Sequence, residues 1–217
     1  LAIGEMGIGN TTTSSAITAA ILHLPAEVVA GRGAGLDEKG LLRKRAVIRQ
    51  ALQNYGFYTE RENLSNEVAK VGIVMDKKAP GEHAGQKEEN EREKTLRILE
   101  CVGGYDIACL AGICLGGAKY HVPIVLDGFI SLAAALVACR LEPMTREYLI
   151  PSHSGKEPAV KAIEEELGLT PIIYAKMALG EGTGAVMMLQ LLKTANAVLE
   201  RSTSFAAANI EQYERFK

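Results

Sequence analysis

Three segments of the chain share one pattern, in which a short apolar run leads through a glycine-bearing turn into a long helical stretch. The three runs with their turns lie at residues 1–10, 122–129 and 170–184. Short runs of β-branched residues before long helices predict strand–loop–helix units, which assemble into a parallel sheet covered by helices on both faces. We therefore expect an α/β fold whose ligands lie at these turns, beyond the carboxyl ends of the strands.

The composition fits a globular protein that does not act through bulk charge. The 217 residues are 47% hydrophobic, and 24 Lys and Arg nearly cancel 26 Asp and Glu. A nucleic-acid binder of the usual kinds needs a basic excess or stacking aromatic residues, and aromatic residues make up only 5% of the chain. No apolar run approaches the roughly 18 residues of a membrane span. We expect neither nucleic acid nor a membrane as a partner.

The cysteines and histidines indicate neither a disulfide framework nor a metal site. Cys101, Cys109, Cys114 and Cys139 form no C-x-x-C pair and fall in apolar helical sequence, as expected of reduced thiols in a cytoplasmic protein. The histidines have no ligand-like spacing to cysteines or carboxylates. We predict no metal and no cofactor.

Helices fill most of the remaining chain, with one segment of different character. Helical spacing and capping residues predict helices at 37–54, 95–102, 105–119 and 157–167. Residues from about 55 to 94 combine a short strand-like run with a highly charged one, which is typical of a solvated insertion without chemistry. We assign residues 1–185 to an α/β core that contains this insertion, and residues 186–217 to a C-terminal helical segment of a small domain.

The first turn, Gly4 to Asn10, combines glycines with one carboxylate. Its glycines allow backbone N–H groups to approach an anion closely, and the following helix adds partial positive charge. A phosphate site and a plain strand-to-helix turn with Glu5 in water both fit this pattern. Asn10 or Thr11 is expected to cap the helix through its side-chain oxygen.

The third turn places Glu181 between Gly180 and Gly182. Small neighbours leave the carboxylate room to reach a substrate, and we expect Leu179 and the following helix to shield it partly from water, which favours a general base. An acidic residue that only interacts with the helix dipole is the alternative. Because Glu5 follows another strand of the same sheet, we expect the two carboxylates to converge on one pocket.

Three further features are candidates for ligand contact. Asp127 ends the second strand, where it either contacts a ligand or caps the helix that follows. The run 31–35 is glycine-rich and suits a second anion contact, while Lys44 stands between two arginines, a setting in which lysines are usually solvated. The turn at 151–155 holds a histidine among hydroxyls but lacks the partners of a hydrolase triad.

Five ordered blocks of the sequence resemble a known enzyme family. In chain order they are GEMGIGNTT (4–12), GRGAGLD with RKRAVI (31–37 and 43–48), VGGYDIACLAG (102–112), VLDGFIS (125–131) and LGEGTGA (179–185). Together they resemble the nicotinate-nucleotide–dimethylbenzimidazole phosphoribosyltransferases, which make the lower-ligand nucleotide of cobamides such as vitamin B12. The resemblance implies a Rossmann-like parallel sheet flanked by helices, part of a small helical domain, and a homodimer that needs no metal or redox cofactor.

The resemblance also implies a reaction and roles for individual residues. That family transfers 5-phosphoribose from nicotinate mononucleotide to a nitrogen of 5,6-dimethylbenzimidazole, giving alpha-ribazole 5'-phosphate and nicotinate. Glu181 would be the general base that takes the azole proton. The other implied contacts are Glu5, Met6, Leu179 and Gly180 in the acceptor pocket, Gly7, Ile8 and Gly9 at the product, Gly33, Ala34, Gly35 and Lys44 at phosphate, and Asp127, Gly128 and Ser152 beside ribose and nicotinate.

Family members are substantially longer, and the resemblance covers about their C-terminal three-fifths. We therefore expect the chain to be a fragment of a longer protein. A truncated relative that binds a nucleotide or azole without turnover is the competing function. A dinucleotide oxidoreductase is disfavoured, because the chain lacks G-x-G-x-x-G with its acidic partner.

Overall fold

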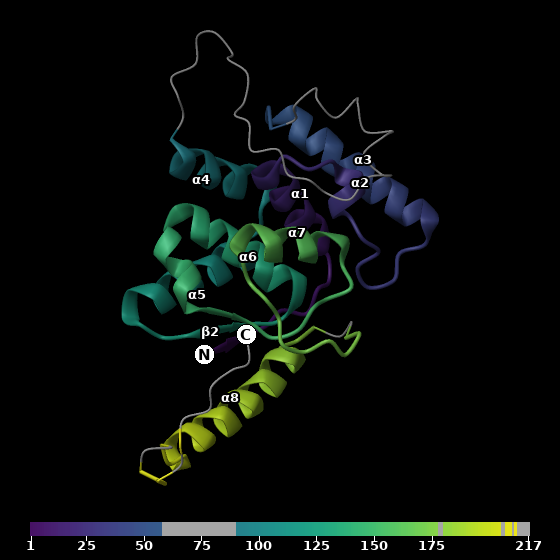
Figure 1. Cartoon of the computed structure of the whole chain (residues 1–217). Helices are drawn as coiled ribbons and strands as arrows, with labels where there is room; N and C mark the ends of the chain where they lie inside the picture. The colour runs from purple at the N-terminus through teal and green to yellow at the C-terminus, as the bar shows by residue number, and fades with distance from the viewer. Residues whose placement is uncertain (58–89, 178–179, 205–206, 210, 212–217) are drawn as a thin grey trace.

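The parallel sheet predicted from the strand–turn–helix units is present, and helices surround it (Figure 1). We describe the protein from a computed structural model, which places residues 1–57, 90–177, 180–204, 207–209 and 211. Within these ranges the strands are β1 (Ala2–Ile3), β2 (Ile124–Leu126) and β3 (Leu149–Pro151). They pair in parallel in the order β1-β2-β3, with Ala2 opposite Val125 and Val125 opposite Ile150.

The helices of the described residues follow the chain from the first turn to the C-terminal region. They are α1 (Thr11–Leu22), α2 (Ala26–Val29), α3 (Glu38–Asn54), α4 (Glu91–Val102), α5 (Tyr105–Tyr120), α6 (Gly128–Leu141), the 3-10 helix η3 (Pro143–Tyr148), α7 (Pro158–Leu167) and α8 (Thr183–Arg201). The central helix is α6, which packs against α1, α4, α5 and α7. Every residue from Phe129 to Ala138 is buried, as expected of a helix that is apolar on all sides.

The middle strand carries apolar residues toward both faces of the sheet. Side chains alternate along a strand, so Ile124 and Leu126 join the large core around α6. Val125 points to the opposite face, where it joins Ala185 and Met188 of α8 in a separate small cluster. The sheet therefore has most of its helices on one face and α8 on the other, the Rossmann-like arrangement that the sequence predicts.

The apolar run that opens the segment 170–184, predicted as the third strand, is not a strand of the sheet. The third strand is β3, and the predicted segment lies beside the chain that follows β3, where Ile173 forms a single bridge with His153. Pro171 lacks a backbone N–H and therefore cannot donate to a ladder. Ile172 and Tyr174 are exposed, so no packing stabilises a longer pairing.

The helix predictions hold with changed ends. Asp37 caps α3 by accepting a hydrogen bond from the Gly40 N–H at 2.7 Å. The charged run predicted as an insertion up to residue 94 ends earlier, because α4 begins at Glu91, where Asn90 caps it by accepting from the Arg92 N–H. The strand-like run of this insertion lies outside the described residues.

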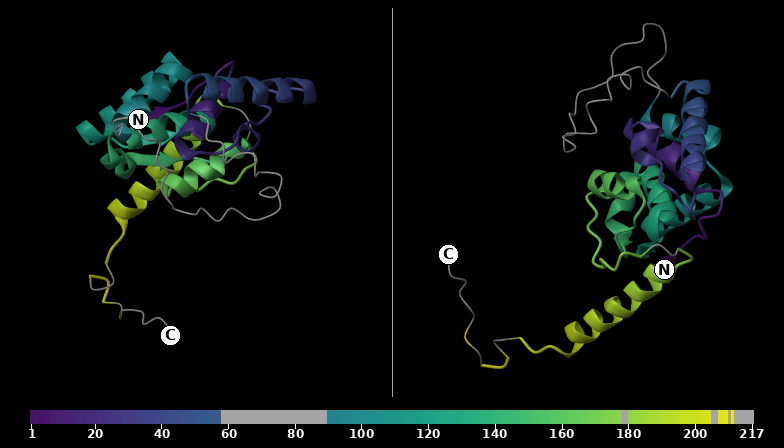
Figure 2. Two further views of the ribbon diagram at one scale, coloured as in Figure 1. Left: turned by 90° about the horizontal axis from the view of Figure 1, so that it is seen from above. Right: turned by 90° about the vertical axis from the view of Figure 1, so that its right-hand side faces the viewer.

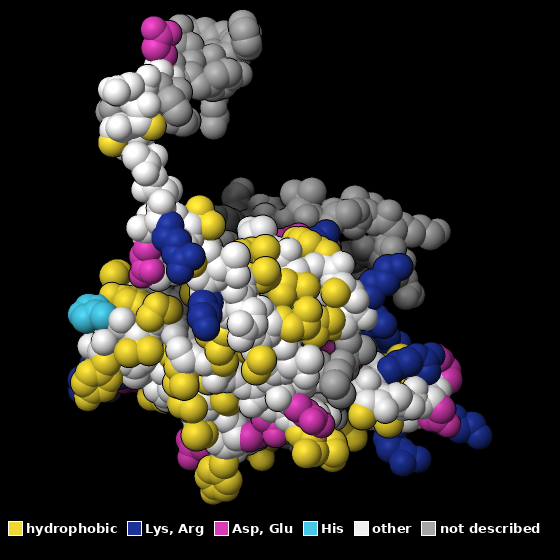
Figure 3. All heavy atoms as spheres, turned by 90° about the horizontal axis from the view of Figure 1, so that it is seen from below, with side chains coloured by type: hydrophobic (Ala, Val, Ile, Leu, Met, Phe, Trp, Pro, Cys, Tyr) yellow, Lys and Arg dark blue, Asp and Glu magenta, His cyan; other side chains and the backbone are white. Residues whose placement is uncertain are grey.

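The C-terminal helix α8 extends from the sheet away from the other helices (Figures 1 and 2). The helix packs on β1 and β2. The predicted boundary between residues 185 and 186 falls inside this continuous helix. Farther along, Val198 and Leu199 are 62% and 75% exposed. Many hydrophobic side chains are exposed on the face seen from below, the side from which α8 extends (Figure 3). Within the part of the chain that the structure describes, no helix combines the length and apolarity needed to cross a membrane.

Candidate active site

The turns at the carboxyl ends of the strands enclose a cavity of about 730 Å³, a volume typical of small-molecule sites. Its walls come from the turn after β1, the 31–34 loop, the β2–α6 junction, the loop after β3 and the turn before α8. The predicted residues that line it are Glu5, Met6, Gly7, Ile8, Gly33, Ala34, Asp127, Gly128, Gly180 and Glu181. A second cavity of about 330 Å³ adjoins it and is lined by the other two predicted glycines, Gly9 and Gly35.

The first and third turns, far apart in sequence, lie backbone against backbone. The Glu181 N–H donates a hydrogen bond to the Glu5 carbonyl oxygen at 3.1 Å. An added Cβ on Gly180 would lie 2.7 Å from that same oxygen, and one on Gly4 would lie 2.5 Å from the Gly182 Cα. Only glycine permits both approaches. The structure thus brings the backbones of the turns that carry Glu5 and Glu181 together at one end of the cavity.

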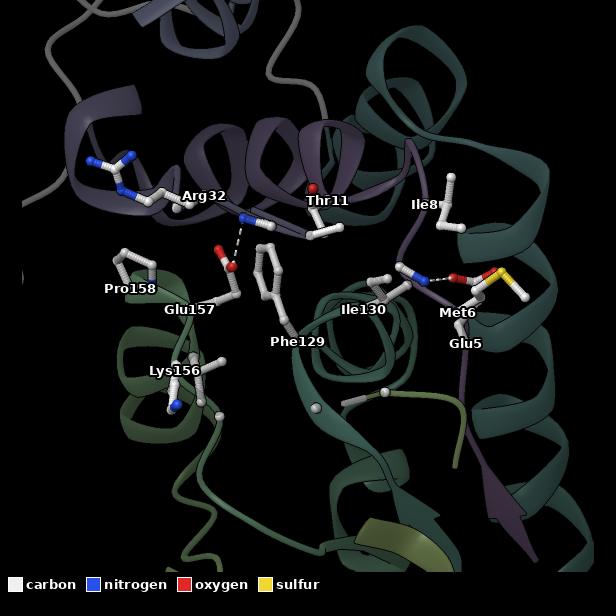
Figure 4. Close-up of a pocket in the computed structure, with 18 of the residues that line it drawn as sticks. Glu5, Met6, Ile8, Thr11, Arg32, Phe129, Ile130, Lys156, Glu157 and Pro158 are labelled. Carbon is white, nitrogen blue, oxygen red and sulfur yellow. Dashed lines mark hydrogen bonds between the residues drawn. The ribbon is translucent and has the colours of Figure 1, made fainter. Parts of the chain in front are cut away.

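The Glu5 side chain is held by the turn that carries it. Its Oε2 accepts a hydrogen bond from the Gly7 N–H at 2.7 Å (Figure 4) and another from the Asn10 side-chain amide. The same amide donates to Asp106 at the start of α5 at 2.7 Å. Asn10 therefore links two carboxylates instead of capping α1, which has no side-chain cap. The expectation of a cap from Asn10 or Thr11 is wrong: Asn10 has helical backbone angles, φ −91° and ψ −7°, in place of the extended conformation of a capping residue, and its side chain is directed to Glu5 and Asp106.

Glu181 lies at the rim of the cavity with its side chain exposed. The expectation that it is partly shielded from water is not met by the described residues, and Leu179 lies outside them. The reason is its place in the turn: Glu181 and Gly182 have φ of 66° and 84°, and the Thr183 N–H bonds to the Gly180 carbonyl. Two successive positive φ values with this bond are typical of a type I′ turn, whose tip carries the Glu181 side chain outward.

Asp127 lines the cavity, yet its carboxylate bonds to the protein itself. Oδ2 accepts from the Gly182 N–H at 2.7 Å, and Oδ1 accepts from the Gly184 N–H at 2.8 Å. Sequence reasoning allowed a ligand contact or a cap of the next helix. The cap is wrong, because Asp127 gives no side-chain cap to α6 and instead binds the start of α8. The ligand contact of Asp127 stays a prediction.

Ser152 is the one predicted contact of the 151–155 turn in the site, and it does not line either cavity. It is fully buried, and its Oγ lies 3.0 Å from Nδ1 of His153. His153 does line the large cavity. The Ser152 hydroxyl thus lies beside the adjacent ring, and the contact implied by the resemblance stays a prediction.

The end of the cavity opposite Glu5 is rich in cations and backbone amides. Arg32, Arg45 and Lys156 line it together with Glu157, whose Oε1 accepts from the Gly33 N–H at 2.9 Å. Figure 4 shows Glu157 and Glu5 on opposite sides, with Phe129 and Ile130 between them. The cavity therefore has a carboxylate end and a cationic end.

Lys44 lies outside the cavity and binds two groups next to its cationic end. Its ammonium is buried and donates to Thr11 Oγ1 and to the Gly31 carbonyl oxygen, both at 3.0 Å. Burial lowers the pKa of Lys44 below its ordinary value, and the nearby Glu157 carboxylate opposes that shift. Lys44 does not itself line the cavity, and the phosphate contact implied by the resemblance stays a prediction.

Several lining residues were not singled out from the sequence. They are Arg45, Phe129, Ile130, Lys156, Glu157 and Pro158. Phe129 and Ile130 directly follow Gly128, so their place at the strand end was a usable signal. No signal in the sequence pointed to Glu157, because its partner Gly33 lies 124 residues away.

The site offers acid–base groups and anion-binding donors without a metal centre. Among the described residues, no three His, Cys, Asp or Glu side chains are grouped so that they would hold a metal ion. Carboxylates at one end suit proton transfer from a substrate, and backbone amides with cations at the other suit a phosphate. The spacing between the two ends is filled by apolar side chains, as is usual where a ring or sugar lies.

Comparison with known proteins identifies relatives over nearly the whole chain. A sequence profile described as phosphoribosyltransferase matches residues 1–74 and 68–210. The nicotinate-nucleotide–dimethylbenzimidazole phosphoribosyltransferase of Ruminiclostridium cellulolyticum is 36% identical over 99% of this chain and 51% of its own length. The enzyme of that name from Roseiflexus castenholzii is 40% identical over 97% of this chain and 50% of its own length.

A solved structure agrees with these sequence matches. A crystal structure of CobT from Thermus thermophilus superposes with a TM-score of 0.76 at 37% identity, covering 98% of this chain and 54% of that one. The chain thus spans about half the length of the curated relatives it matches. From the sequence profile and these relatives, the chain belongs to the nicotinate-nucleotide–dimethylbenzimidazole phosphoribosyltransferase family.

Proposed function

We propose that the protein carrying this chain transfers 5-phosphoribose from nicotinate mononucleotide to a ring nitrogen of 5,6-dimethylbenzimidazole or a related azole. The products are alpha-ribazole 5'-phosphate and nicotinate, for the lower ligand of cobamides. The observation that carries the proposal is the backbone contact between the turns of Glu5 and Glu181 at one end of a cavity whose other end is lined by Arg32 and Lys156. The names of the relatives supply the substrate class.

In the proposed reaction, the azole nitrogen attacks the anomeric carbon of the ribose as the bond to nicotinate breaks. The N–H proton of the azole passes to Glu181, and the electron pair of the broken bond leaves with nicotinate. Glu5 lies beside Glu181, and the Gly7 and Asn10 donors on its Oε2 fix its direction. Holding both reactants in line is itself a large part of such catalysis.

We place the phosphate at the cationic end, beside Arg32, Lys156 and the loop from Gly33 to Gly35. The N–H groups of Gly33 and Gly35 bond to Glu157 and to the Arg32 carbonyl, so the positive charge for an anion comes from the arginine and lysine side chains. Lys44 contributes through the Thr11 hydroxyl and the Gly31 carbonyl that it holds. Gly128 borders the space between the two ends, where we place the ribose.

The acceptor end is open in the described residues. Met6 and Ile8 are 58% and 72% exposed at this end, and Glu181 is exposed beside them. We propose that Met6 packs against the flat azole ring, and that further polypeptide, of the kind present in the longer relatives, completes the wall around Glu181. A flat apolar ring over these side chains would remove apolar surface from water.

The test is Glu181→Gln in the protein that carries this chain. Turnover, measured as nicotinate release from nicotinate mononucleotide and dimethylbenzimidazole, should fall by at least about 100-fold, since positioned general bases contribute roughly 10²–10⁴. Binding of the mononucleotide, measured by calorimetry without acceptor, should change by less than about twofold because phosphate contacts lie at the other end.

A matched control is Glu100→Gln, which removes a glutamate from the exposed surface of α4 away from the cavity, and which should leave turnover unchanged. Unaltered turnover in Glu181→Gln would remove Glu181 from its role. The competing function, a module that binds nucleotide or azole without chemistry, is favoured instead if the unsubstituted protein binds both ligands and releases no nicotinate.

We also propose that the protein is cytoplasmic and forms a homodimer. The four cysteines are free, which supports a reducing compartment. Exposed apolar side chains along α8, such as Val186 and Leu199, support an interface with further polypeptide. Light scattering that finds a monomer at micromolar concentration would contradict the dimer.

A further inference from the structure

We infer that Asp127 is a positioning residue, which holds the turn at 180–185 so that Glu181 stays beside Glu5 at the acceptor end. The inference rests on the proposed function for the role of Glu181. It differs from the substrate contact that the resemblance implies for Asp127, and it is carried by the hydrogen bonds of the carboxylate and by the backbone of the turn.

Both carboxylate oxygens of Asp127 are occupied by donors from one segment. Oδ2 accepts from the Gly182 N–H at 2.7 Å, while Oδ1 accepts from the N–H groups of Gly184 and Ala185 at 2.8 and 3.2 Å. Asp127 is only 3% exposed. These are the first N–H groups of the 19-residue helix α8, which would otherwise lack partners and which favour a negative charge.

The start of α8 also packs so tightly against Asp127 that position 184 has no room for any residue larger than glycine. A Cβ on Gly184 would lie 2.7 Å from Asp127 Oδ1 and closer still to Nδ1 of His153. His153 Nδ1 itself lies 3.6 Å from Asp127 Oδ1. The start of α8 is thus seated directly on the end of β2, with the carboxylate between them.

The turn so held has an unfavourable backbone conformation. Glu181 has a φ of 66°, and residues with a Cβ avoid this region. Two contacts fix it: Asp127 binds the N–H of the next residue, Gly182, and the Glu5 carbonyl binds the N–H of Glu181 itself. Strain retained by surrounding contacts is common at functional sites, and here Asp127 supplies one of the two contacts that retain it.

The variant Asp127→Asn separates positioning from substrate binding. Asparagine keeps the shape but replaces one acceptor oxygen by an NH2 donor, which must then face one of the backbone N–H groups. We expect kcat for nicotinate release to fall about 10- to 100-fold and KM for nicotinate mononucleotide to change less than about threefold. Amide hydrogen exchange of Gly182 and Gly184 should become at least about tenfold faster. A substrate ligand would instead raise KM and leave these amides protected.

A double variant tests whether Asp127 acts through Glu181. If it does, adding Asp127→Asn to Glu181→Gln lowers the residual kcat no further, because residues that act as a unit are not additive. A full second loss would show an independent role and overturn the inference. Glu142→Gln is the matched control: Glu142 accepts a backbone N–H at the start of η3, away from the cavity, and its loss should change neither kcat nor exchange at residues 182–185.

Two further outcomes distinguish a failure of the inference from a failure of the proposed function. If the unsubstituted protein releases no nicotinate, the proposed function fails, whereas unchanged exchange at Gly182 and Gly184 in Asp127→Asn overturns the inference in either case. If Asp127→Asn does not fold, Asp127→Ser, which is smaller and retains one acceptor oxygen, takes its place in every measurement.

Discussion

Replacing Gly4 with alanine is expected to push apart the two turns that carry Glu5 and Glu181. The new Cβ would lie 2.5 Å from the Gly182 Cα and closer still to its nitrogen, whereas real Cβ atoms essentially never approach within 3.0 Å. Both obstructing atoms are backbone, so no side-chain rotation relieves the contact. The turns must therefore separate by at least 0.5 Å, the difference between 3.0 and 2.5 Å.

That separation has two measurable consequences. A misplacement approaching 1 Å costs on the order of 100-fold in rate, so kcat for nicotinate release should fall about 10- to 100-fold. Overpacking of this kind also destabilises a protein by about 1–3 kcal/mol, which urea denaturation would detect. The Glu181 N–H to Glu5 carbonyl bond, now 3.1 Å long, would lengthen as well.

The matched control is Gly112→Ala, the same substitution on the exposed surface of α5. An added Cβ there meets nothing within 4 Å, so the variant should keep its turnover and gain about 0.5–1 kcal/mol in the free energy of unfolding. If Gly4→Ala instead matched the unsubstituted protein in both kcat and stability, the close contact between the turns would have no part in holding the site.

Three other predictions follow from buried groups. Burial raises the pKa of Glu164 to about 7 from 4.5, so the folded state keeps a proton that the unfolded chain releases. The free energy of unfolding should therefore fall from pH 5 to pH 8 by at most about 3 kcal/mol. In urea denaturation, Glu164→Gln should show a flatter dependence of this free energy on pH, and an equal slope would contradict the prediction. Exposed Cys109 should react with iodoacetamide at pH 8, while Cys114, whose pKa burial raises to about 12, should react only after unfolding, as peptide mass spectrometry would show. Lys44→Met removes two hydrogen bonds from the cationic end and should raise KM for nicotinate mononucleotide about 10-fold, with an unchanged KM arguing against phosphate at that end.

The glycine turns could be predicted from the sequence because their constraint is local. A short apolar run, glycines and a helix define a strand end, and parallel strands present those ends at one edge. The turns of Glu5 and Glu181 were therefore expected at one edge, where their backbones are in contact and both residues line the cavity. The run at 170–175 looked equally strand-like, but strand formation depends on a partner, and residues 149–151 occupy the place beside β2.

The partners of buried polar groups could not be predicted in this way. Asp127 was placed at the correct edge, yet its donors lie 55 to 58 residues farther along the chain. From the sequence Asn10 is expected to cap a helix, but in the fold its side-chain amide donates to Asp106. The carbonyl partner of Lys44 is likewise non-local, since the Gly31 carbonyl reaches its ammonium only when the 31–35 loop folds back on α3. Local propensity holds no information on such long-range pairs.

The central claim is that Glu181 receives a proton from the azole acceptor at the end of the cavity that it shares with Glu5. A crystal of the protein that carries this chain, soaked with 5,6-dimethylbenzimidazole, tests this most directly. The account predicts a Glu181 carboxylate oxygen within about 3 Å of a ring nitrogen, the reach of a general base, with the ring against Met6. An azole bound at the cationic end, with Glu181 turned to solvent, would contradict it.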